Sequence, residues 1–95
     1  MNKRWHLVFV GQVQGVGFRY TAQSIAKRLQ VVGWIRNLND GRVETVIEAT
    51  PAQLQEFVDE LSASTHGYVT EMEKNESAAS NEFDSFQIVR NYTTR

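Results

Sequence analysis

The sequence predicts one α+β domain, residues 1–95, in which two helices cover one face of a largely antiparallel β-sheet. Its length is the first observation, because 95 residues hold one hydrophobic core, and no linker or repeat divides them. The second is periodicity: apolar residues alternate along some segments and recur at helical spacing along two others. The third is order, since the segments follow one another as β-α-β-β-α-β, with a short strand added at the end.

The first strand, the turn after it and the first helix follow from the first thirty residues. Residues 5–10 are rich in β-branched and aromatic side chains, with Leu7 and Phe9 on one face. Three glycines then fall within residues 11–17. The next apolar residues have the spacing of one helix face: Ala22, Ile25, Ala26 and Leu29.

Two strands joined by a tight hairpin are expected next. Residues 33–38 form the second strand, and Asn39-Asp40-Gly41 has the composition of a turn that requires positive φ. In the third strand the apolar or small residues at 43, 45, 47 and 49 alternate with Glu44 and Glu48. We expect these two glutamates to face water.

The second helix has the clearest boundary signals. Thr50 is an N-cap, Pro51 occupies the first helical position and Gln53 completes a capping box. The stripe on its apolar face is Leu54, Phe57, Val58 and Leu61.

The remaining residues supply a fourth strand at 67–73, a polar surface loop at 74–82 and a short last strand at 86–90, after which the chain frays. With both helices striped on one side, this order is the ferredoxin-like split βαβ sandwich: two helices on one face of a mostly antiparallel sheet.

Composition excludes several classes of function. The net charge is −1 and the pI about 6.1, so no general attraction to nucleic acid or to an anionic membrane is expected. No cysteine is present, which excludes disulfides, thiolate zinc sites and cysteine nucleophiles. The apolar stretch at 7–10 is too short for a signal peptide, and no run has the length of a membrane span. A cytoplasmic protein is expected.

The glycine loop is the segment that predicts chemistry. Between Trp5 and Ala26 the only formally charged residue is Arg19, directly after Gly15 and Gly17 and at the start of the helix. Backbone N–H groups of such a turn bind anions, the helix N-terminus adds positive potential, and an arginine holds two phosphate oxygens. The alternative is a tight turn followed by an exposed arginine, although a helix N-terminus is the unfavourable end for a cation.

Two familiar phosphate motifs do not fit. Residues 15–20 lack the third glycine of the dinucleotide fingerprint, and the loop has no lysine for a Walker A motif. We expect Val13, Val16 and Phe18 to anchor the loop to the core.

Two segments resemble the signature motifs of the acylphosphatases: Gly-Gln-Val-Gln-Gly-Val-Gly-Phe-Arg at 11–19 and Gly-Trp-Ile-Arg-Asn-Leu-Asn-Asp-Gly-Arg-Val at 33–43. The element order is similar over nearly the whole chain, and the similarity fades between residues 62 and 81.

The resemblance implies an enzyme that hydrolyses small-molecule acyl phosphates without metal or cofactor. We expect a monomer. It makes Arg19 the catalytic arginine and Asn37 the residue that orients the attacking water. The phosphate cradle would be the backbone N–H groups of Gly15, Val16, Gly17, Phe18 and Arg19. The chemistry is consistent, because an acyl phosphate is already activated and its hydrolysis depends mainly on positioning and charge stabilisation.

Other polar and aromatic residues are interpreted as structural. His6 and His66 lie outside both motifs, Asp40 is a turn residue, and Trp34 and Phe18 belong to the core. Arg36 and Arg42 are expected on the solvated surface. Where the resemblance leads us to expect a Leu-Gly-Leu-like helix end, Gln30 stands in the glycine position, which predicts a strained left-handed C-cap.

Two other functions stay open. An RNA-recognition module shares this element order, but it needs stacking aromatics on its central strands, and residues 42–50 contain none. A catalytically idle anion-binding domain would retain the same cradle, although the presence of both Arg19 and Asn37 argues against it.

Overall fold

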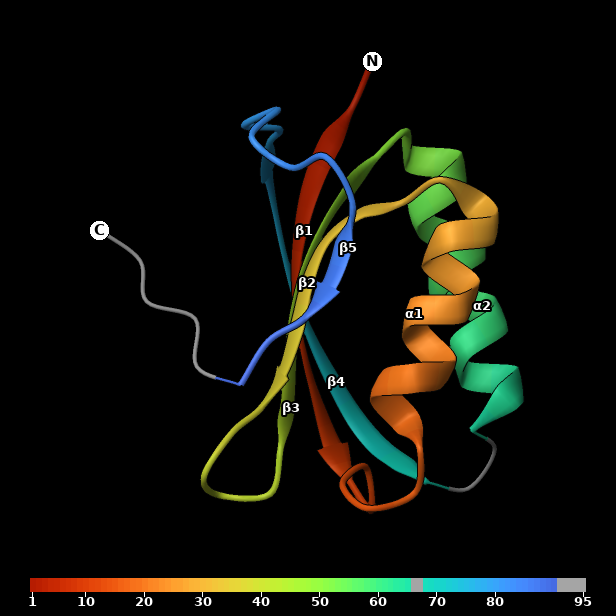
Figure 1. Ribbon diagram of the computed structural model, residues 1–95, viewed down its shortest axis with the longest axis vertical. Helices are drawn as coiled ribbons and strands as arrows, with labels where there is room; N and C mark the ends of the chain where they lie inside the picture. The colour runs from red at the N-terminus through yellow and green to blue at the C-terminus, as the bar shows by residue number, and fades with distance from the viewer. Residues whose placement is uncertain (66–67, 91–95) are drawn as a thin grey trace.

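The structure, a computed structural model, describes residues 1–65 and 68–90. Two helices lie side by side on one face of a sheet that Figure 1 shows nearly edge-on. The elements in chain order are β1 (Lys3–Gly11), α1 (Phe18–Leu29), β2 (Val32–Asn37), β3 (Val43–Ala49), α2 (Pro51–Ser64), β4 (Val69–Ala78) and β5 (Phe86–Ile88).

The sheet has five strands in the order β4-β1-β3-β2-β5. β1 pairs antiparallel with both β3 and β4, and β2 pairs antiparallel with β3. Only β5 runs parallel to its neighbour, β2. The predicted ferredoxin-like α+β fold is therefore confirmed.

One hydrophobic core lies between the helices and the sheet. The strand residues in this core occupy alternate positions, because successive side chains of a strand point to opposite faces. Phe9 packs edge-on against Phe18, the first residue of α1, with 5.1 Å between ring centroids. The largest fully buried apolar side chains of the core are Phe9, Phe18, Phe57, Phe86, Leu7, Ile35, Ile47, Leu54 and Leu61.

The predicted start of α2 and the predicted end of α1 are both confirmed. The Thr50 hydroxyl accepts the Gln53 N–H at 3.3 Å, and the Gln53 side chain accepts the Thr50 N–H at 2.9 Å, which completes the capping box. Gln30 ends α1 in the left-handed conformation, with φ 61° and ψ 37°. A residue with a Cβ is strained there.

The prediction of a surface loop at 74–82 is wrong for its first half, because β4 continues to Ala78. Its backbone pairs with β1 over the whole length of that strand, while its side chains are almost all exposed. A strand of this kind lacks the apolar alternation on which the prediction relied. The last strand ends at Ile88, earlier than expected, although the Val89 N–H still donates to Ile35 O at 2.9 Å. Residues 66 and 67 lie outside the described residues.

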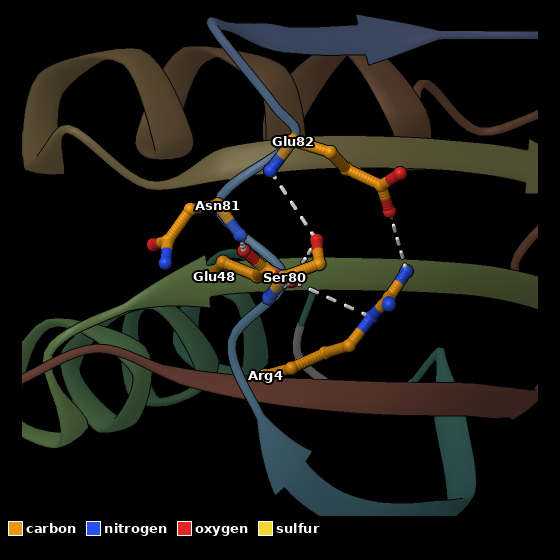
Figure 2. Close-up of polar contacts among 5 residues, drawn as sticks. All are labelled: Arg4, Glu48, Ser80, Asn81 and Glu82. Atoms are coloured by element: carbon orange, nitrogen blue, oxygen red, sulfur yellow. Dashed lines mark hydrogen bonds and ion pairs between the residues drawn. The ribbon is translucent and has the colours of Figure 1, made fainter.

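The connection 79–85 crosses the face of the sheet that the helices leave open (Figures 1 and 2). The expectation that Glu48 faces water is therefore wrong: it is 2% exposed. Its carboxylate accepts the N–H groups of Ser80 at 2.8 Å and Asn81 at 2.9 Å and the Ser80 hydroxyl at 2.9 Å, with Arg4 Nε 3.6 Å away. Trp34 is buried, as expected, but on this same face of the sheet and outside the cluster that packs against the helices.

Candidate active site

The loop between β1 and α1 is fixed at two points. Val13 and Phe18 are both buried in the core, as predicted. Val16 is 41% exposed, so the expectation that it also anchors the loop is wrong. It stands between Gly15 and Gly17, whose left-handed conformations place it at the tip of the turn.

The backbone of this loop presents a run of N–H donors that lack acceptors. Gly15 has φ 79° and Gly17 has φ 78°, values that a residue with a Cβ adopts only under strain. Gly17 is the N-cap of α1 and supplies no side-chain cap, and the first backbone bond of the helix runs from Thr21 N to Gly17 O at 3.0 Å. Within the described chain, the five N–H groups of residues 15–19 donate to no acceptor. Such a turn, joined to a helix N-terminus, suits an anion.

Arg19 and Asn37, which come from different elements, line one pocket of about 440 Å³. Arg19 is in the first turn of α1 and makes no hydrogen bond or ion pair to any residue in 1–65 or 68–90. The Oδ1 atom of Asn37 is shielded from solvent and accepts no hydrogen bond from the described residues. The pocket thus combines an unpaired cation with an unpaired acceptor. Its remaining lining residues are Tyr20, Ile88, Val89 and Arg90.

Gln14 connects the loop to the hairpin that carries Asn37. Its Nε2 donates to Leu38 O at 2.8 Å and to Arg42 O at 3.0 Å. Asn37 ends β2 opposite Val43, on the same face of the sheet as the core. These two hydrogen bonds join the loop that precedes Arg19 to the hairpin that follows Asn37. No pattern in the sequence distinguishes Gln14 from the other polar residues of the loop.

Two further ion-pair clusters, centred on Glu44 and Asp40, lie outside the pocket. Glu44 Oε2 lies 2.6 Å from His6 Nε2, and Glu44 Oε1 accepts Arg36 Nε at 2.8 Å. Burial alone would raise the pKa of Glu44, but the contacts with His6 and Arg36 outweigh it and hold that pKa below its usual value. Arg36 is therefore paired and partly exposed, at 26%, so the expectation of a solvated surface position holds only in part.

The hairpin turn holds the second cluster. Asp40 accepts the Arg42 N–H at 3.1 Å and Arg42 Nε at 2.7 Å, which confirms Asp40 as a turn residue. The Arg42 backbone N–H lowers the pKa of the Asp40 carboxyl, and the Arg42 side chain adds to the effect. The carboxylates of both clusters are thus engaged by other cations, and no acidic residue of the described chain lines the pocket.

Comparison with known proteins identifies the family. A model of the acylphosphatase family matches residues 5–88. This chain belongs to the acylphosphatase family. An acylphosphatase of Marinobacter nauticus is 41% identical over 85 residues, which cover 88% of this chain and 92% of the relative. The crystal structure of acylphosphatase from Bacillus subtilis has a TM-score of 0.85 and 36% identity, and the match covers 92% of this chain and 98% of that one.

Neither a membrane span nor a metal-binding cluster is found in the part of this acylphosphatase-family chain that the structure describes. Neither helix there is long and apolar enough to cross a bilayer. No three side chains of the types His, Asp and Glu gather there in a group that could hold a metal ion.

Proposed function

We propose that this acylphosphatase-family chain hydrolyses small-molecule acyl phosphates in the pocket between α1 and β2. The observation that carries the proposal is that Arg19 and Asn37 line one pocket, and that Arg19 directly follows the loop whose backbone N–H groups have no acceptor among the described residues. The N–H groups of residues 15–19 and the Arg19 guanidinium lack partners within the described chain, and so does Asn37 Oδ1.

The donors suit a phosphoryl group. Negative charge on the equatorial phosphate oxygens is stabilised by the backbone N–H groups of residues 15–19, which have no other acceptor among the described residues. The planar guanidinium of Arg19 takes two oxygens at once, a geometry that a lysine ammonium does not reproduce.

Asn37 positions the nucleophile in this proposal. In this mechanism the Asn37 side chain turns its buried Oδ1 toward the pocket, where water donates a hydrogen bond to it. The oxygen of this water attacks phosphorus. The bond between phosphorus and the acyl oxygen breaks, and that oxygen leaves on the carboxylate product. A substrate phosphate oxygen accepts the proton of the water, so that inorganic phosphate is the second product. A neutral amide suits this position because a carboxylate would repel the anionic substrate.

Hydrolysis proceeds without a metal ion or cofactor in this mechanism, because the backbone donors and Arg19 supply the charge stabilisation. The monomeric state and the cytoplasmic location stay predictions from the sequence.

Hydrolysis of benzoyl phosphate in excess EDTA tests the proposal. We expect robust turnover that EDTA does not diminish, with inorganic phosphate as a competitive inhibitor, because substrate and product share the phosphoryl end. Phosphate binding without turnover would support the idle anion-binding domain. Turnover abolished by EDTA would overturn the metal-free mechanism. If a large excess of inorganic phosphate leaves KM and kcat unchanged, the assignment of residues 15–19 as the phosphate cradle is wrong.

A further inference from the structure

The pocket that holds Arg19 and Asn37 contains a second arginine, which neither signature segment includes. Arg90 follows β5, the strand that runs parallel to β2. Ile88 is in register with Ile35, so Arg90 lies two residues beyond this pair, as Asn37 does on β2. The parallel pairing therefore brings Arg90 to the end of the sheet where Asn37 lies.

Arg90 has no partner of opposite charge within residues 1–65 and 68–90. In contrast, Arg36 pairs with Glu44, Arg42 with Asp40, and Arg28 with Glu60. Of the described arginines, the two that line the pocket are the two left without a carboxylate. Like charges placed in one cleft repel each other, and their arrangement is favourable when an anionic ligand compensates both.

The phosphoryl end of a substrate does not need both cations. The run of backbone donors at residues 15–19, together with Arg19, already offers more hydrogen bonds than three terminal oxygens require. Arg90 comes from the other side of the pocket, on the segment that follows β5. Its guanidinium is therefore available to the acyl portion of the substrate.

Three larger side chains line the pocket together with the two arginines. Tyr20 is 67% exposed although it is a large aromatic residue, and it lines the pocket together with Ile88 and Val89. These side chains offer contact surface to the carbon skeleton of an acyl group, while the arginines offer charge to anionic groups.

We propose that Arg90 selects acyl phosphates whose acyl group carries a second anionic group, such as a carboxylate, at the end remote from the phosphate. The inference rests on the proposed function, since it concerns the acyl side of the same substrate. Arg90 is a specificity-determining residue in this view and takes no part in the bond that breaks.

The test compares benzoyl phosphate with para-carboxybenzoyl phosphate. The two acyl phosphates differ by one carboxylate, which the rigid ring holds away from the phosphate, and their uncatalysed hydrolysis rates provide the correction for reactivity. We expect the wild-type protein to have a larger kcat/KM for the carboxylated acyl phosphate, through a lower KM. Arg90→Gln should reduce the ratio of the two kcat/KM values by roughly threefold to tenfold, as expected for a partly exposed charge-assisted pair.

Lys27→Gln is the matched control, because it removes the same charge from α1 about 12 Å along the helix axis from Arg19. Lys27 is exposed and lies outside the pocket. This variant should keep both kcat/KM values and their ratio. An equal fall of the ratio in both variants would reduce the effect to general electrostatic attraction and overturn the inference.

The outcomes separate the two proposals. If neither acyl phosphate is hydrolysed, the proposed function fails. If both are hydrolysed with a ratio near one, or if Arg90→Gln leaves the ratio unchanged, the proposed function stands and the role of Arg90 is wrong.

Discussion

Glu48→Gln is expected to destabilise the fold although it preserves the shape of the side chain. The carboxylate accepts three hydrogen bonds from Ser80 and Asn81, as Figure 2 shows. A glutamine offers one oxygen and directs an amide N–H₂ group at the remaining donors. At least one backbone N–H then loses its acceptor, and Arg4 loses its buried counter-charge.

A hydrogen bond to a charged group contributes about 1.5–3 kcal/mol. Because the connection 79–85 is partly exposed, water can hydrate part of what is released, and we expect a loss of about 2 kcal/mol in the free energy of unfolding. For a domain of this size each kcal/mol corresponds to about 4–8 °C in Tm, so Tm should fall by roughly 8–16 °C.

Urea denaturation at pH 7 measures the loss, with Glu82→Gln as the control. Glu82 is 49% exposed and pairs with the same Arg4 at 3.3 Å, so its substitution should cost less than about 0.5 kcal/mol. If Glu48→Gln costs no more than Glu82→Gln, the buried carboxylate does not hold the connection to the sheet.

The stability difference between wild type and Glu48→Gln should also depend on pH. Burial alone would raise the pKa of Glu48, but the hydrogen bonds from Ser80 and Asn81 and the charge of Arg4 outweigh burial and lower it. A depressed folded-state pKa contributes stability above the unfolded value, near 4.3, and this contribution is lost as the pH falls through the folded value. The difference should therefore be full at pH 7 and shrink in acid below about pH 4.

Substitutions at three positions test the site and the helix end. Arg19→Lys should lower kcat/KM for benzoyl phosphate by about 10²-fold or more, nearly as much as Arg19→Ala, and near wild-type activity would reduce Arg19 to a general attracting charge. Asn37→Ala should greatly lower kcat and leave the inhibition constant of phosphate unchanged, and Asn37→Asp should not restore the rate. Full kcat in the alanine variant would exclude a role of Asn37 in positioning water. Gln30→Gly should raise the free energy of unfolding by about 1 kcal/mol in urea denaturation, because glycine relieves the left-handed strain, and a lower value would contradict that explanation.

The element order, both helix ends and the core stripes were predictable because each depends on local spacing. The length of β4 was not, because its pairing uses backbone groups and its exposed side chains carry no apolar alternation. In β3, the alternation of apolar and polar residues correctly placed Glu48 on the face opposite the core. Whether the other face stays open depends on a connection more than thirty residues later in the chain.

The candidate site, too, was predictable only in part. Arg19 and Asn37 stand within short motifs, and the structure places both on one pocket. Gln14 could not be singled out, because its acceptors are hairpin carbonyls that only the folded chain brings near. Arg90 lies outside both motifs, and only the parallel pairing of β5 with β2 brings it to the pocket.

The long outer strand β4 also determines how the sheet meets other copies of the chain. A free strand edge is a template for the growth of intermolecular sheets. This edge carries three glutamates and one lysine within residues 71–76, all exposed, so a second copy adding here would bring carboxylates against carboxylates. The opposite edge, β5, is only three residues long. Both edges of the sheet therefore discourage the addition of a second copy.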